Sequence, residues 1–65
     1  MRTTLVMAKN LRAGMYLVES KKGRRIGLHI CEVHVSRRVV DIRVNENNGF
    51  GARKYRRTVP VKVMR

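Results

Sequence analysis

Lysine and arginine are the residues whose number and spacing point most clearly to a chemistry in this chain. They gather in three groups, each within five consecutive positions. The groups are Lys21, Lys22, Arg24 and Arg25; Arg37 and Arg38; and Arg53, Lys54, Arg56 and Arg57. Ammonium and guanidinium groups bind phosphate oxygens, and the planar guanidinium does so with two parallel hydrogen bonds. The spacing therefore predicts a surface that binds a polyanion.

The overall charge supports this prediction. Sixteen Lys and Arg residues stand against four acidic residues, which gives a formal net charge of +12. Because most of these cations have no acidic partner within the chain, they repel one another and destabilise the compact state. Nucleic acid, either DNA or RNA, is the expected partner, contacted along its phosphate backbone without regard to sequence. A cationic surface that serves only solubility is the alternative explanation.

Aromatic residues are too few for a surface that stacks several bases, since Tyr16, Phe50 and Tyr55 are the only ones. Tyr55 lies among the last group of cations, where its ring could stack on a base. It also shares the parity of the valines in 59–63, which favours packing in the core. Phe50 lies in a turn-rich segment, 45–51, where an exposed ring could contact a partner protein.

Metal binding and catalysis receive little support. His29, Cys31 and His34 are residue types that bind zinc, but strand alternation turns His34 away and no fourth ligand is evident. We therefore expect no metal and no cofactor. The acidic residues show no paired arrangement, and no phosphate-binding glycine loop precedes a helix, so we expect no catalytic residues and no enzyme activity.

The remaining composition indicates a compartment. Cys31 is the only cysteine, so no intramolecular disulfide can form. No apolar run approaches the roughly 18 residues that a membrane span requires. The cytoplasm is therefore the expected location, that of the host cell if the protein is viral, and no membrane partner is expected. Oligomerisation could add stability, because a chain of 65 residues buries a thin core.

Short β-branched runs separated by turn residues predict an all-β protein. We expect five strands, over 3–8, 15–19, 26–35, 39–44 and 53–63. Apolar residues change parity within 26–35, which predicts a β-bulge near Cys31 and Glu32. In 39–44, alternation places Val40, Ile42 and Val44 inward.

Five short antiparallel strands predict a single domain, over residues 1–65, folded as a small SH3-like barrel. A five-stranded oligonucleotide-binding (OB-like) barrel is the alternative. Met7 offers a second start, so residues 1–6 are expected to be an edge strand or a dispensable extension.

A short motif supports the barrel. Leu11 and Gly14 form a "leucine, two residues, glycine" turn, followed by a strand, the basic turn at Lys22 and Gly23, and Gly27 before an apolar strand. Residues 11–35 thereby resemble the KOW and related SH3-like barrels of translation and transcription factors, although Met15 stands where that family usually has Asp or Asn. The resemblance implies an SH3-like barrel that acts on nucleic acid.

The size and layout of the chain are also similar to small accessory proteins of tailed bacteriophages. Two functions follow from these observations. The first is a nucleic-acid-binding module in which the three basic groups form a stripe along the barrel, with Tyr55 among them. The alternative is a protein-interaction module that docks on an acidic host protein through Phe50 and the basic loops.

Overall fold

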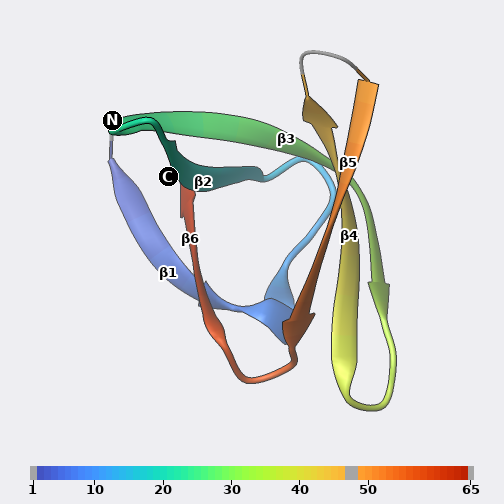
Figure 1. Ribbon diagram of the computed structural model, residues 1–65. Helices are drawn as coiled ribbons and strands as arrows, with labels where there is room; N and C mark the ends of the chain where they lie inside the picture. The colour runs from blue at the N-terminus through green and yellow to red at the C-terminus, as the bar shows by residue number, and fades with distance from the viewer. Residues whose placement is uncertain (1, 47–48, 65) are drawn as a thin grey trace.

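The computed structural model describes residues 2–46 and 49–64. They form an all-β protein, as predicted, with one antiparallel sheet of six strands and one short 3-10 helix, η1 (Figure 1). The strands are β1 (Thr3–Met7), β2 (Tyr16–Lys21), β3 (Arg24–Val35), β4 (Val39–Glu46), β5 (Gly49–Arg56) and β6 (Pro60–Met64), and η1 (Ala8–Asn10) follows β1. The order in the sheet is β1-β6-β2-β3-β4-β5, so β1 and β5 lie at its two edges.

The strand count corrects the sequence-based prediction. The single strand expected over 53–63 is two strands, because the chain turns between Arg56 and Pro60, where the Val59 N–H donates to the Arg56 carbonyl over 3.1 Å. The sequence pattern did not indicate this turn, because the apolar residues on both sides of it occupy odd-numbered positions. They are Tyr55, Val59, Val61 and Val63. Pro60 is the first residue of β6, a position where a missing N–H is tolerated.

The strand pairing is that of an open sheet of six strands, where five strands were predicted. Among the described residues, β1 pairs only with β6 and β5 pairs only with β4. The sheet is nevertheless strongly curled, because β3 changes direction along its length (Figure 1).

The bend in β3 lies at a shift of register. The first half of β3 pairs with β2 as far as His29, and the second half pairs with β4 from Ile30 onward. The register with β4 shifts between Ile30 and Glu32, which confirms the predicted bulge. An extra residue in one strand increases twist and bends it. One strand therefore serves both halves of the sheet.

The core lies on the concave face. Val40, Ile42 and Val44 are at most 2% exposed, which confirms that this side of β4 faces inward. The other buried apolar residues are Ala8, Leu11, Leu17, Val18, Leu28, Ile30, Val61 and Val63. The described ladder between β2 and β6 is one pair, Leu17 opposite Val63, so these side chains join the two halves of the sheet.

The turn after η1 attaches to the bend. The Gly14 N–H donates to the Ile30 carbonyl and the Ile30 N–H donates to the Met15 carbonyl, both over 2.8 Å. Gly14 has a φ of +98°, which favours glycine at this position. The leucine–glycine turn thus fixes the chain against the point where β3 bends.

Replacing Leu17 tests the join between the halves. Leu17→Ala should lower the free energy of unfolding by about 2–5 kcal/mol, because a buried leucine leaves a cavity when it is truncated. Leu5→Ala is the matched control: Leu5 is 64% exposed, so its truncation should change stability by no more than about 0.5 kcal/mol. Urea denaturation measures both variants, and equal midpoints would contradict the assigned core.

Candidate functional site

The four acidic side chains are all engaged by cations. Arg53 contacts Glu19 at 2.6 Å and Glu46 at 2.7 Å. The more exposed pairs, Arg43–Glu32 and Lys54–Asp41, are each separated by 3.8 Å. The other Lys and Arg side chains that the structure describes form no salt bridge with these carboxylates; they are Arg2, Lys9, Arg12, Lys21, Lys22, Arg24, Arg25, Arg37, Arg38, Arg56, Arg57 and Lys62.

Four of these cations lie at the turn between β2 and β3, which we call the basic hairpin: Lys21, Lys22, Arg24 and Arg25. Lys21 pairs with Arg24 across the ladder, so Lys22 and Gly23 make a two-residue turn. Both have positive φ, +51° and +77°. A two-residue turn of this type matches strand twist and holds its flanking residues in register. All four cations are exposed and close together.

Four more cations gather where β5 ends beside the turn between β3 and β4, and we call them the arginine cluster: Arg37, Arg38, Arg56 and Arg57. Arg56 lies opposite Val39 in the ladder. The Arg57 N–H donates to the Arg38 carbonyl over 3.3 Å, and Arg57 Nη1 donates to the Arg37 carbonyl over 3.4 Å. Two of the sequence groups are therefore joined into one exposed surface.

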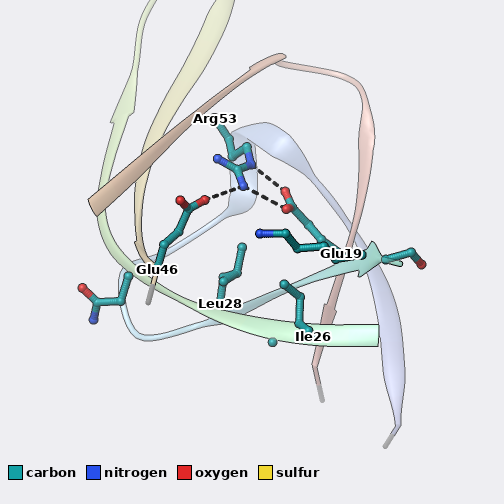
Figure 2. A pocket seen from close by; sticks show the side chains of 9 residues that line it. Glu19, Ile26, Leu28, Glu46 and Arg53 are labelled. Atoms are coloured by element: carbon teal, nitrogen blue, oxygen red, sulfur yellow. Dashed lines mark hydrogen bonds and ion pairs between the residues drawn. The ribbon is translucent and has the colours of Figure 1, made fainter. Parts of the chain in front are cut away.

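Arg53 is separated from the rest of its sequence group. Its Nε and Nη2 donate to the two oxygens of Glu19 over 2.6 and 2.9 Å, and Nη2 also donates to Glu46 over 2.7 Å (Figure 2). Nη1 donates to the carbonyl of Ala52 over 2.9 Å. Because these N–H groups donate to atoms of the protein itself, the Arg53 side chain has a structural role. We call Glu19, Arg53 and Glu46 the ion triad.

The ion triad connects strands that are not neighbours in the sheet. Glu19 lies on β2 and Arg53 on β5, with β3 and β4 between them. Gly51 gives Glu46 room, because a Cβ at that position would lie 2.5 Å from the Glu46 carboxyl carbon. Hydrogen bonds from Arg53 lower the pKa of Glu19, and the two carboxylates raise the pKa of Arg53. The triad therefore holds the curled sheet across its concave side.

A pocket of about 760 Å³ opens beside the triad (Figure 2). Ile26 and Leu28 form an apolar part of its wall. Its ionisable lining residues are the triad and Lys21, so two carboxylates balance two cations. Lys21 also belongs to the basic hairpin, so the pocket borders that cluster.

The other predicted contact residues belong to neither cluster. Lys54 is opposite Asp41 and paired with it. Tyr55 is half-buried against the core, and burial raises its pKa. Phe50 is 72% exposed, but it lies on β5 opposite Asn45 and not in a loop.

The segment 45–51 is thus mostly strand, which corrects the prediction of a turn-rich loop there. β4 continues through Glu46 and β5 begins at Gly49. Residues 47 and 48 lie outside the described residues. Turn-forming residue types marked a hairpin correctly, but they did not show how far the flanking strands extend.

The His and Cys residues of β3 do not converge. Cys31 Sγ lies 3.8 Å from His29 Nδ1, and the His29 ring packs edge-on against Tyr16 with centroids 5.2 Å apart. His34 lies opposite Asp41, beyond the register shift. Within the described ranges, 2–46 and 49–64, no group of three or more His, Cys, Asp and Glu residues could hold a metal ion.

Acid titration tests the ion triad. The pKa of Glu19 lies below its ordinary value of 4.5, so its pairing stabilises the folded protein above that value and is lost as pH falls through the lowered pKa. The urea midpoint should therefore decrease as pH falls from about 5 to about 3. Glu19→Gln should show a smaller decrease, because glutamine does not ionise.

Glu32→Gln is the matched control for this titration. Glu32 and Arg43 have side chains 69% and 67% exposed, and exposed pairs add little stability. This variant should retain the wild-type decrease. An equal decrease in all three proteins would show that the triad does not stabilise the fold.

The described residues therefore form two exposed basic clusters. They also form the ion triad, which lies on the concave face. None of them forms a helix long and apolar enough to cross a membrane. Comparisons of the chain with protein-family models, with curated proteins and with solved structures find no match.

Proposed function

We propose that the protein binds nucleic acid without sequence specificity, through contacts of the basic hairpin and the arginine cluster with the phosphate backbone. One observation carries the proposal: every acidic side chain is already paired with Arg43, Arg53 or Lys54. The eight cations of the two clusters are exposed and form no salt bridge with those carboxylates. External phosphates are suitable counterions for such groups.

The mode of binding is electrostatic contact with the backbone. Tyr55 packs against the core, and Tyr16, which is 45% exposed, packs edge-on against His29 and belongs to neither cluster. Without stacking or a reading helix, base identity contributes little to binding. Arg53 and Lys54, which the sequence grouped with the binding residues, are assigned to internal ion pairs in this proposal.

We also propose that the curled sheet is an SH3-like barrel with one added strand. β2 to β6 run consecutively, and β6 returns beside β2, which gives the order β6-β2-β3-β4-β5. The ion triad spans from β5 to β2, and the Ala8 and Lys9 N–H groups donate to carbonyls of Val59 and Arg57 over 2.9 and 3.0 Å. β1 is then the addition, at the far side of β6.

Exposed Phe50 supports a second candidate function. A ring that is 72% exposed on an edge strand could anchor an acidic partner protein, such as a host protein if this is a phage accessory protein. Phe50 belongs to neither basic cluster, so the two functions make separable predictions. Phe50→Ala should leave nucleic-acid affinity unchanged, and loss of that affinity in a filter-binding titration would extend the proposed site to the Gly49 end of β5.

Neutralising the arginine cluster tests the main proposal. A variant with Arg37, Arg38 and Arg56 all changed to Gln should bind duplex or RNA more weakly, with a flatter dependence of log affinity on log salt. Loss of each phosphate contact should reduce the slope by roughly 1. Filter binding across a salt series measures both quantities.

A variant with the same change in net charge is the control. Arg2, Arg12 and Lys62 lie in neither cluster, and changing all three to Gln should alter the slope less. Equal effects of the two triple variants would show that net charge alone drives binding. Absence of binding to any nucleic acid by the wild-type protein at low salt would overturn the proposal.

A further inference from the structure

We infer that the basic hairpin and the arginine cluster bind two separate nucleic-acid segments, so that one copy of the protein bridges two duplexes. The inference rests on the proposed function and adds a bridging activity to it. It depends on where the clusters lie, on what lies between them and on the shape of the strand that separates them.

The clusters lie at opposite ends of β3. The basic hairpin surrounds Arg24, where the strand begins, and the arginine cluster lies at the turn that follows Val35. β3 contains 12 residues, and each residue of a strand adds about 3.3 Å. The longest dimension of the molecule is 33 Å. Salt at 0.1 M screens charges beyond about 10 Å, so clusters at the two ends act independently.

The region between the clusters is balanced in charge. Glu32–Arg43 and Asp41–Lys54 pair on the outer side of β3, β4 and β5, and the ion triad occupies the concave side. All four carboxylates of the protein lie in these pairs. The expected stripe of positive charge is thus interrupted, and a backbone lying along the middle of the sheet would meet acidic groups.

The bend of β3 turns the two clusters in different directions. Figure 1 shows the strand running across the sheet from the basic hairpin and then turning toward the arginine cluster. A duplex is a stiff rod, and bending it to follow the turn of β3 costs deformation energy. Two straight duplexes, one at each cluster, avoid this cost. Each cluster offers four exposed cations for such a contact.

A capture experiment tests bridging. One duplex of about 100 base pairs is attached to beads, a second fluorescent duplex is in solution, and protein is added at about 0.1 M salt, where the two clusters are screened from one another. Wild type should retain the fluorescent duplex on the beads. Two variants each lack one cluster: Lys21, Lys22, Arg24 and Arg25 changed to Gln, or Arg37, Arg38, Arg56 and Arg57 changed to Gln.

Each single-cluster variant should still bind one duplex in a filter assay, but should reduce capture to the level of beads without protein. A control with Arg2, Arg12 and Lys62 changed to Gln should still capture. Duplex binding by wild type without capture would overturn bridging and leave the proposed function intact.

Capture by either single-cluster variant at the wild-type level would also overturn the inference, because bridging would then arise from self-association of the protein. If wild type binds neither duplex, the proposed function and the inference both fall.

Discussion

The structure depends on the bend in β3. β3 contains 12 residues and lies between β2 and β4 in the sheet. Its first half pairs with β2, its second half pairs with β4, and its register with β4 shifts between Ile30 and Glu32. The sheet curls at this point, and Ile30 is fully buried there. The backbone of Ile30 forms hydrogen bonds with the backbone of Gly14 and Met15.

The curl has an electrostatic consequence. It brings β5 across from β2, where Arg53 meets Glu19 and Glu46. This contact engages two of the four carboxylates with one guanidinium. Few acidic groups then remain near the other cations, so the ends of β3 keep an unbalanced positive charge. The same bend thus shapes the core and concentrates the charge at two places.

Local features of the chain were predictable from sequence, whereas contacts between distant segments were not. The change of parity around Cys31 predicted the bulge, and alternation predicted the buried side of β4. Both depend on residues next to one another in the chain. The turn before Pro60 was missed because valines on either side keep the same parity.

The site shows the same division. The basic hairpin was predictable as a unit, because its four cations flank one turn. The union of Arg37 and Arg38 with Arg56 and Arg57 requires the pairing of β4 with β5, which joins positions about 20 residues apart. Arg53 is separated from its sequence group by its contact with Glu19, which lies 34 positions away in the chain. The pattern of residue types within a short stretch of sequence predicts neither contact.

The pairing of β1 with β6 also bears on the order of folding. Thr3 lies opposite Met64, so this ladder closes a loop of almost the whole chain, whereas β2 to β5 form consecutive hairpins. Loop-closure entropy rises with length, and non-local pairings form slowly. We expect the hairpins from β2 to β5 to form first, β6 to return next and β1 to add last. By the same reasoning, we expect β1 to be the first strand to detach when the native protein opens.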